Sequence, residues 1–135
     1  MSDFNERIIA EFRANGGHVE TAGFGDSLVI LHSIGARSGQ ERVNPVLAIA
    51  VDGDWLIAAS KAGAPENPAW YANLKAHPEV SIETGTDTVD VVASEVLGDD
   101  YAAAWGRFVA QSPAFERYAE KASERHIPVV RLSPR

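Results

Sequence analysis

A short turn in the first third of the chain gathers the side chains best suited to binding an anion. Residues 35–42 read Gly-Ala-Arg-Ser-Gly-Gln-Glu-Arg, and Ala-Ser-Lys follows at residues 59–61, after one predicted hairpin. Glycines permit a turn whose backbone N–H groups converge, the serine adds a short donor, and Arg37, Arg42 and Lys61 add charge-assisted hydrogen bonds. The pattern predicts a cradle for phosphate or carboxylate. The alternative is a solvated hairpin turn, since glycine, serine and arginine are common turn residues.

The first segment of the chain has the pattern of an amphipathic helix. Apolar residues recur at helical spacing over residues 3–14, and Asp3 and Glu6 can form a capping box at the start. We expect this helix to cover one end of a barrel. The alternative, a helix that approaches lipid, would need more cations than Arg7 and Arg13 provide.

Six apolar runs rich in β-branched residues are typical of strands. Asp52-Gly53 between the second and third runs predicts a tight hairpin. Pro45 has no N–H to donate, so the second strand should begin irregularly there or lie at an edge. The predicted strands are 27–32, 43–51, 55–59, 80–83, 88–96 and 128–132.

Three later segments have residue patterns typical of the start of a helix. Asn67 and Pro68 fit an N-cap and a first helical residue, with His77 at the other end. Two further helices are predicted from residues 99–100 and 112–113. The elements fit a mainly β chain with helices (α+β), in which about six strands form a small barrel and the helices pack outside.

Composition narrows the classes of function. The 135 residues carry a net charge of -7 and no cysteine. We expect one domain over residues 1–135, a cytoplasmic location and no stable membrane insertion, since no run is apolar enough to span a bilayer and the start lacks a signal-peptide pattern. The acidic balance argues against a nucleic-acid partner. Without cysteine, redox chemistry would depend on a bound cofactor.

Two other kinds of catalytic site lack support in the sequence. The four histidines show no pair at helical ligand spacing, so we expect no metal site. A Gly-x-Ser-x-Gly turn, which would indicate Ser-His-Asp hydrolysis, does not occur between a predicted strand and a helix.

Three sequence motifs follow one another along the chain, and a fourth segment lies near its end. They are GARSGQERVNP at residues 35–45, AASKAGA at 58–64 and NPAWYANLKAHP at 67–78, with RHIPVV at 125–130. With these motifs the chain resembles the deazaflavin-dependent nitroreductase family over most of its length. The resemblance implies a split β-barrel like those of flavin reductases and FMN-binding proteins. It also implies the cofactor coenzyme F-420 (an 8-hydroxy-5-deazaflavin), with hydride transfer to a nitroaromatic, a quinone or an activated alkene.

The resemblance implies which residues hold the cofactor. The turn that ends at Arg42 and the lysine at Lys61 would hold its phosphate and oligoglutamate tail, while the following strand would flank the deazaflavin ring. Many relatives have a basic residue at the position of Ala36, so one tail contact is missing here. Trp70 and Leu74 are also expected to pack in the core. The expected cofactor-binding residues are Ala36, Arg37, Ser38, Arg42, Val43, Asn44, Pro45, Val46, Leu47, Ala58, Ala59, Ser60, Lys61, Asn67, Trp70, Tyr71, Asn73 and Leu74.

Ser60 and Tyr118 are the candidate catalytic donors, because each offers a hydroxyl where the resemblance places the electron acceptor. The alternative for Ser60 is a hydrogen bond to its own backbone. Phe115, three residues before Tyr118, can be a core residue. A small-molecule acceptor is the expected partner, and the chain is expected to be a monomer or a homodimer. Two rival readings are an FMN-dependent reductase on the same barrel and a non-catalytic carrier of a deazaflavin or a lipid-like ligand.

Overall fold

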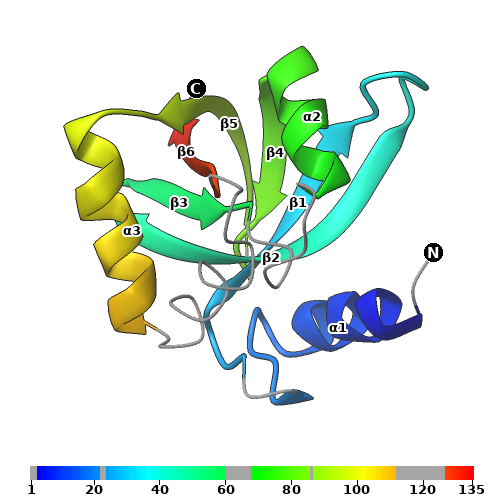
Figure 1. The fold of residues 1–135 in the computed structure, drawn as a ribbon. Helices are drawn as coiled ribbons and strands as arrows, with labels where there is room; N and C mark the ends of the chain where they lie inside the picture. The colour runs from blue at the N-terminus through cyan, green and yellow to red at the C-terminus, as the bar shows by residue number, and fades with distance from the viewer. Residues whose placement is uncertain (1–2, 22–23, 60–67, 86, 112–126) are drawn as a thin grey trace.

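Six antiparallel strands close into a barrel in the computed structural model, which describes residues 3–21, 24–59, 68–85, 87–111 and 127–135 (Figure 1). Their order around the barrel is β1-β2-β3-β6-β5-β4. The strands of these described residues are β1 (Leu28–Ile34), β2 (Glu41–Val51), β3 (Asp54–Ala58), β4 (Glu79–Glu83), β5 (Thr88–Val96) and β6 (Val129–Pro134). The expected mainly β barrel is confirmed. Strand β5 has the predicted bounds, and the ends of the other five strands differ from the predicted ones by at most two residues.

Strand β2 changes partner halfway along its length. Residues 41–47 pair with β1, and residues 48–51 pair with β3. Pro45 pairs with Ile30 in the first half, where the other side of β2 has no strand partner among the described residues. A residue without an N–H is tolerated at such an edge, as predicted. Within the described part of the chain, the backbone groups on that side of residues 41–47 are therefore not used in strand pairing.

The hairpin between β2 and β3 turns at Asp52 and Gly53. Their φ angles are 52° and 86°. Positive φ at both central residues defines a type I′ turn, which matches the twist of the flanking strands. The predicted hairpin is confirmed.

Two helices of the described residues pack on the outside of the barrel. Helix α1 (Asp3–Ala14) buries Ile8 and Phe12 against Leu28 and Ile30. Helix α3 (Asp99–Gln111) packs Ala104 and Phe108 against the outer faces of β2, β3 and β6. Because side chains alternate across a strand, the opposite faces of these strands fill the barrel interior. None of the helices in the described part of the chain has the length and apolar character needed to cross a membrane.

Helix α2 (Ala69–Ala76) closes the barrel end at which β1 finishes and β2 starts (Figure 1). It buries Trp70 and Leu74 in the interior cluster. The prediction that Pro68 is the first helical residue was wrong. Its ψ of 151° keeps it extended, so it occupies the N-cap position. Asn67 and the helix predicted from residue 112 lie outside the described residues.

Candidate functional site

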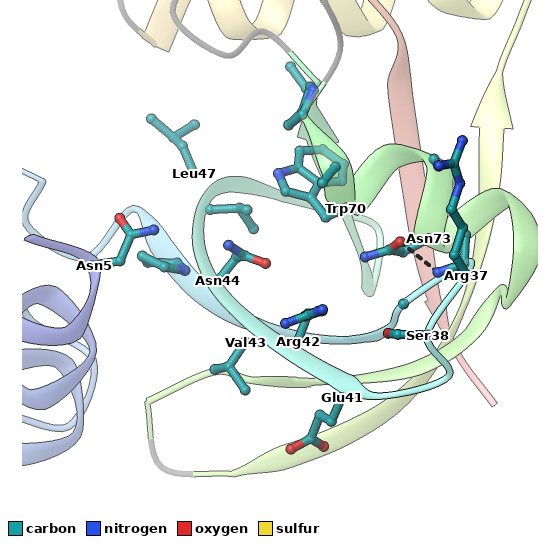
Figure 2. Close-up of a pocket in the computed structure, with 18 of the residues that line it drawn as sticks. Asn5, Arg37, Ser38, Glu41, Arg42, Val43, Asn44, Leu47, Trp70 and Asn73 are labelled. Atoms are coloured by element: carbon teal, nitrogen blue, oxygen red, sulfur yellow. Dashed lines mark hydrogen bonds between the residues drawn. The ribbon is translucent and has the colours of Figure 1, made fainter. Parts of the chain in front are cut away.

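A cavity of about 1140 Å³ lies along the open side of β2. Its walls come from the turn after β1, the first half of β2, the end of β3 and the start of α2, and Asn5 and Phe24 add contacts from segments before the barrel. Figure 2 shows Arg37, Ser38 and Asn73 on one side of this space and Asn5 and Leu47 on the other. The predicted anion cradle and the open strand edge thus share one cavity.

The turn between β1 and β2 is closed by its own backbone. Gly35 N–H donates to the carbonyl of Gln40 at 2.8 Å, and Gly39 N–H donates to the carbonyl of Gly35 at 3.0 Å. Gly39 has a φ of 70°, which favours glycine. A Cβ at Gly35 would lie 2.4 Å from the Ser38 hydroxyl oxygen, so a larger residue there would displace the Ser38 side chain from its present position. The Ser38 oxygen accepts the Gln40 N–H at 3.2 Å, and its proton can still be donated to a ligand.

Asn73 of α2 joins the helix to this turn. Its Oδ1 atom accepts the backbone N–H of Ala36 at 2.9 Å, and its Nδ2 atom donates to the hydroxyl of Ser33 at 3.4 Å. The side chains of Asn73 and Ser33 are both buried. Asn73 therefore positions the cradle as well as lining the cavity.

Among the described residues that line the cavity, two guanidinium groups carry positive charge. Arg37 and Arg42 are exposed and line it. Within the described residues, neither forms an ion pair with a carboxylate. Unpaired arginines beside a glycine turn offer forked donors that match phosphate or carboxylate oxygens. This end of the cavity is built to bind an anion.

A chain of ionisable side chains in contact with one another leads from the cavity rim to α1. The carboxylate of Glu41 lies 3.4 Å from Nδ1 of His32, and Nε2 of His32 lies 2.6 Å from Glu83. Arg13 donates two hydrogen bonds to Glu83, at 3.0 and 2.6 Å. The guanidinium of Arg13 and the ring of His32 lower the pKa of Glu83 to about 2. Through Arg13 and Glu83 the network holds α1 against the barrel. His32 is the partner of Glu41, the carboxylate at the cavity rim.

Most of the expected cofactor-binding residues do line the cavity. Three others lie away from it: Ala59 is fully buried, Leu74 is core, and the hydroxyl of Tyr71 donates to Glu95 at 2.5 Å. Ser60, Lys61, Asn67 and Tyr118 lie outside the described residues. The expected residues that line the cavity are Ala36, Arg37, Ser38, Arg42, Val43, Asn44, Pro45, Val46, Leu47, Ala58, Trp70 and Asn73.

Tyr71 points away because it faces β5. Burial and the bond to Glu95 raise the pKa of Tyr71 to about 12, so the phenol stays protonated and donates to the carboxylate. The amine of Lys75 lies 5.3 Å from the centre of the Tyr71 ring. On a short helix, neighbouring residues project in different directions, and Trp70 and Asn73 take the face toward the cavity.

Several lining residues were not identified from the sequence. Glu41 lies within the first motif, but nothing in the sequence was a reason to assign it a role. Pro68, Ala69 and Ala72 were missed because their side chains carry no functional group. Asn5 and Phe24 come from segments far from the motifs. The amphipathic pattern predicted that α1 packs on the barrel through residues such as Ile8 and Phe12, but it did not indicate that Asn5 and Phe24 would reach the cavity.

Comparison with known proteins identifies the class of this barrel. Residues 6–134 match the F420H(2)-dependent quinone reductase family, to which the chain therefore belongs. The expected family resemblance, the oxidoreductase class and the deazaflavin cofactor of that class are confirmed.

Individual relatives agree with this assignment. An F420H(2)-dependent quinone reductase of Mycobacterium tuberculosis is 42% identical over 112 residues, which cover 79% of this chain and 73% of the relative. A solved F420-H2 dependent reductase, FDR-A, superimposes with a TM-score of 0.72 at 33% identity, over 79% of this chain and 94% of its own. A domain-swapped dimer has a TM-score of 0.74 at 31% identity, over 95% of this chain and 96% of its own.

The barrel itself is more widely shared. A Listeria innocua chain assigned as a pyridoxamine 5′-phosphate oxidase has a TM-score of 0.56 at 12% identity, over 98% of this chain and 94% of its own, and it shows the fold alone. The expected likeness to FMN-binding split barrels is confirmed.

The described residues fit a reduced deazaflavin with an anionic side chain. Among the described residues, the cavity combines two arginines without ion-pair partners at one end with an open strand edge and apolar walls along its length. Carbonyl and N–H groups on the open side of β2 are available to a polar ring edge. The coenzyme would supply the hydride, and the protein would supply binding, orientation and exclusion of water.

Proposed function

We propose that this chain binds reduced coenzyme F-420 along the open side of β2 and reduces a quinone-type acceptor in the same cavity. The observation that carries the proposal is the pair of guanidinium groups, Arg37 and Arg42, which stand beside the closed glycine turn and form no ion pair with another described residue. A phosphate with a carboxylate tail needs such donors. The membership of the quinone reductase family supports the acceptor class.

Each group in the cavity has a separate task in this proposal. Arg37, Arg42 and the Ser38 hydroxyl hold the anionic part of the coenzyme. Asn73 keeps the turn in place against α2. Apolar side chains along β2 and α2, among them Val46 and Trp70, restrict water near the reacting ring. Hydride delivery needs no dedicated general base in the protein.

Four further residues belong to the proposal by their place in the motifs. Lys61 is expected to bind the tail, and Asn67 to lie beside the coenzyme. Ser60 and Tyr118 are expected to donate hydrogen bonds to the oxygen on which negative charge develops. All four lie outside the described residues, so their roles stay predictions.

We also propose that residues 1–135 form one domain that acts in the cytoplasm as a monomer or a homodimer. The absence of cysteine is compatible with a reducing compartment. The similarity to a domain-swapped dimer supports the homodimer.

The direct test of the proposed function is turnover. Purified protein is mixed with reduced coenzyme F-420 and menadione, a small naphthoquinone, and oxidation of the coenzyme is followed by its absorbance. One quinone and one reduced coenzyme should yield one quinol and one oxidised coenzyme, with two electrons and two protons transferred. Protein that binds the coenzyme without accelerating this reaction would be a carrier. Reduction supported by reduced FMN and not by F-420 would make it a flavin reductase.

A further inference from the structure

The cavity is divided by charge. Its cationic end is formed by the turn with Arg37 and Arg42, whereas the other end is lined by Asn5, Phe24 and Leu47, which carry no charge. Figure 2 shows Asn5 and Leu47 on the side away from Arg37. Arg42 and Leu47 are five residues apart on one strand, a separation of about 17 Å. The two ends therefore suit ligands of different chemistry.

The uncharged end is held in place by contacts outside the barrel. Phe24 packs against the cluster that contains Ile8 and Phe12 of α1, and Leu47 of β2 packs against the same cluster. The Phe24 carbonyl accepts the N–H of Ser27 at 3.2 Å and the Ser27 hydroxyl at 2.6 Å. These bonds hold the Phe24 backbone, and packing against the cluster restricts its ring, so less side-chain entropy remains to be lost when a ligand binds against it.

Asn5 adds a polar group to this wall. It stands on the first turn of α1, one helical turn before Ile8, and its half-buried side chain lines the cavity. An amide N–H can donate to a carbonyl oxygen without introducing charge. A planar uncharged ring that carries carbonyl groups would find an aromatic contact and a hydrogen-bond donor here.

We infer that Asn5 and Phe24 form the acceptor subsite of the cavity, and that its ligand is the quinone ring. This inference rests on the proposed function and adds to it the place and contacts of the acceptor. The anionic part of the coenzyme occupies the cationic end and its ring lies beside β2, which leaves the uncharged end for the molecule that is reduced. Negative charge that develops on the quinone oxygen is stabilised by the Asn5 amide.

The test compares Asn5→Ala and Phe24→Leu with the unaltered protein. Asn15→Ala is the matched control, because Asn15 is exposed just beyond α1 and does not line the cavity. Three quantities are measured: calorimetric binding of menadione to protein loaded with oxidised coenzyme, the dissociation constant of the coenzyme, and the melting temperature. We expect each cavity variant to weaken menadione binding about five-fold, equivalent to about 1 kcal/mol, and to leave coenzyme binding within about two-fold. The control should change neither.

The outcomes separate the inference from the function on which it rests. Unchanged menadione binding in both folded variants overturns the subsite. Weakened coenzyme binding with unchanged menadione binding also overturns it, because the wall would then hold the coenzyme itself. Failure of the unaltered protein to bind the coenzyme contradicts the proposed function instead. If Phe24→Leu melts early, Asn5→Ala decides the question alone.

Discussion

The side chain of Asn73 accepts a hydrogen bond from the backbone N–H of Ala36 at 2.9 Å, which ties helix α2 to the turn that follows β1. The same amide donates to Ser33, whose side chain is fully buried. Trp70 on the helix and Arg37 on the turn line one cavity. A single amide therefore fixes the position of the cationic end relative to the wall that faces it.

Asn73→Ala should weaken both the fold and the coenzyme site. Loss of a buried hydrogen-bonding side chain leaves the Ser33 hydroxyl without this donor, and we expect the free energy of unfolding to fall by about 1 to 2 kcal/mol. The dissociation constant of coenzyme F-420 should rise at least about three-fold, because the turn is no longer held. Urea unfolding and a fluorescence titration measure the two effects. Asn15→Ala is the control, and an unchanged dissociation constant in folded Asn73→Ala would mean that the turn holds its shape alone.

Arg42→Ala should lower coenzyme affinity with little effect on stability. Loss of a charge-assisted bond worth about 1.5 to 3 kcal/mol raises the dissociation constant about ten-fold or more. Its dependence on salt should also weaken, because one screened ion pair is gone. Lys61→Ala should behave in the same way. Arg107→Ala, an exposed change on α3, is the control. Normal binding with an early melting transition in Arg42→Ala would make Arg42 a structural residue.

Glu83 should make stability depend on pH at the acid end. Arg13 and His32 hold its pKa near 2, down from an ordinary value of 4.5. Since the unfolded state takes up the proton first, this contribution is complete above about pH 4.5 and is lost as the pH falls toward 2. Glu83→Gln should therefore lower the free energy of unfolding by about 1 to 2 kcal/mol near pH 7, a value reduced for screening at the exposed Arg13.

The measurement is the difference in unfolding free energy between the two proteins at a series of pH values. That difference should shrink between about pH 5 and pH 2. Glu79→Gln, a change of an exposed carboxylate on the same strand, provides the control. A difference that stays constant over this range would show that Glu83 is not held in its charged form.

Tyr71→Phe should affect stability without affecting coenzyme binding. The change removes the donor to Glu95 and leaves that half-buried carboxylate less well partnered. We expect a loss of about 1 to 2 kcal/mol in unfolding free energy and a dissociation constant within about two-fold of the original. The neighbouring Trp70→Phe should instead weaken binding, because Trp70 lines the cavity. A large loss of affinity in Tyr71→Phe would return Tyr71 to the coenzyme site.

The barrel was predictable because its signals are local. The apolar runs rich in β-branched residues, the Asp52-Gly53 turn and the helical spacing over residues 3–14 each depend on nearby residues, and the elements within the described residues formed close to the expected bounds. The start of α2 was misplaced because proline fits both the N-cap and the first helical position. Its extended ψ angle decides between them.

The cavity was only partly predictable. The motif located Arg37 and Arg42, because cations beside glycines have a local chemical meaning. It did not separate Trp70 from Tyr71, since the face that each presents depends on how α2 settles on the barrel. Asn5 and Phe24 depend on the docking of α1, a contact between segments distant in sequence. The amphipathic pattern indicated that α1 would pack on the barrel, but not which residues this packing would bring to the cavity.

The central claim is that the cationic end of this cavity selects a long multi-anionic deazaflavin. The most direct test is a titration of the unaltered protein with coenzyme F-420 and, separately, with FMN at low and moderate salt. We predict tighter binding of F-420, with an affinity that falls as salt rises because exposed ion pairs are screened over about 10 Å at 0.1 M. Equal or tighter binding of FMN, or F-420 binding indifferent to salt, would contradict the account.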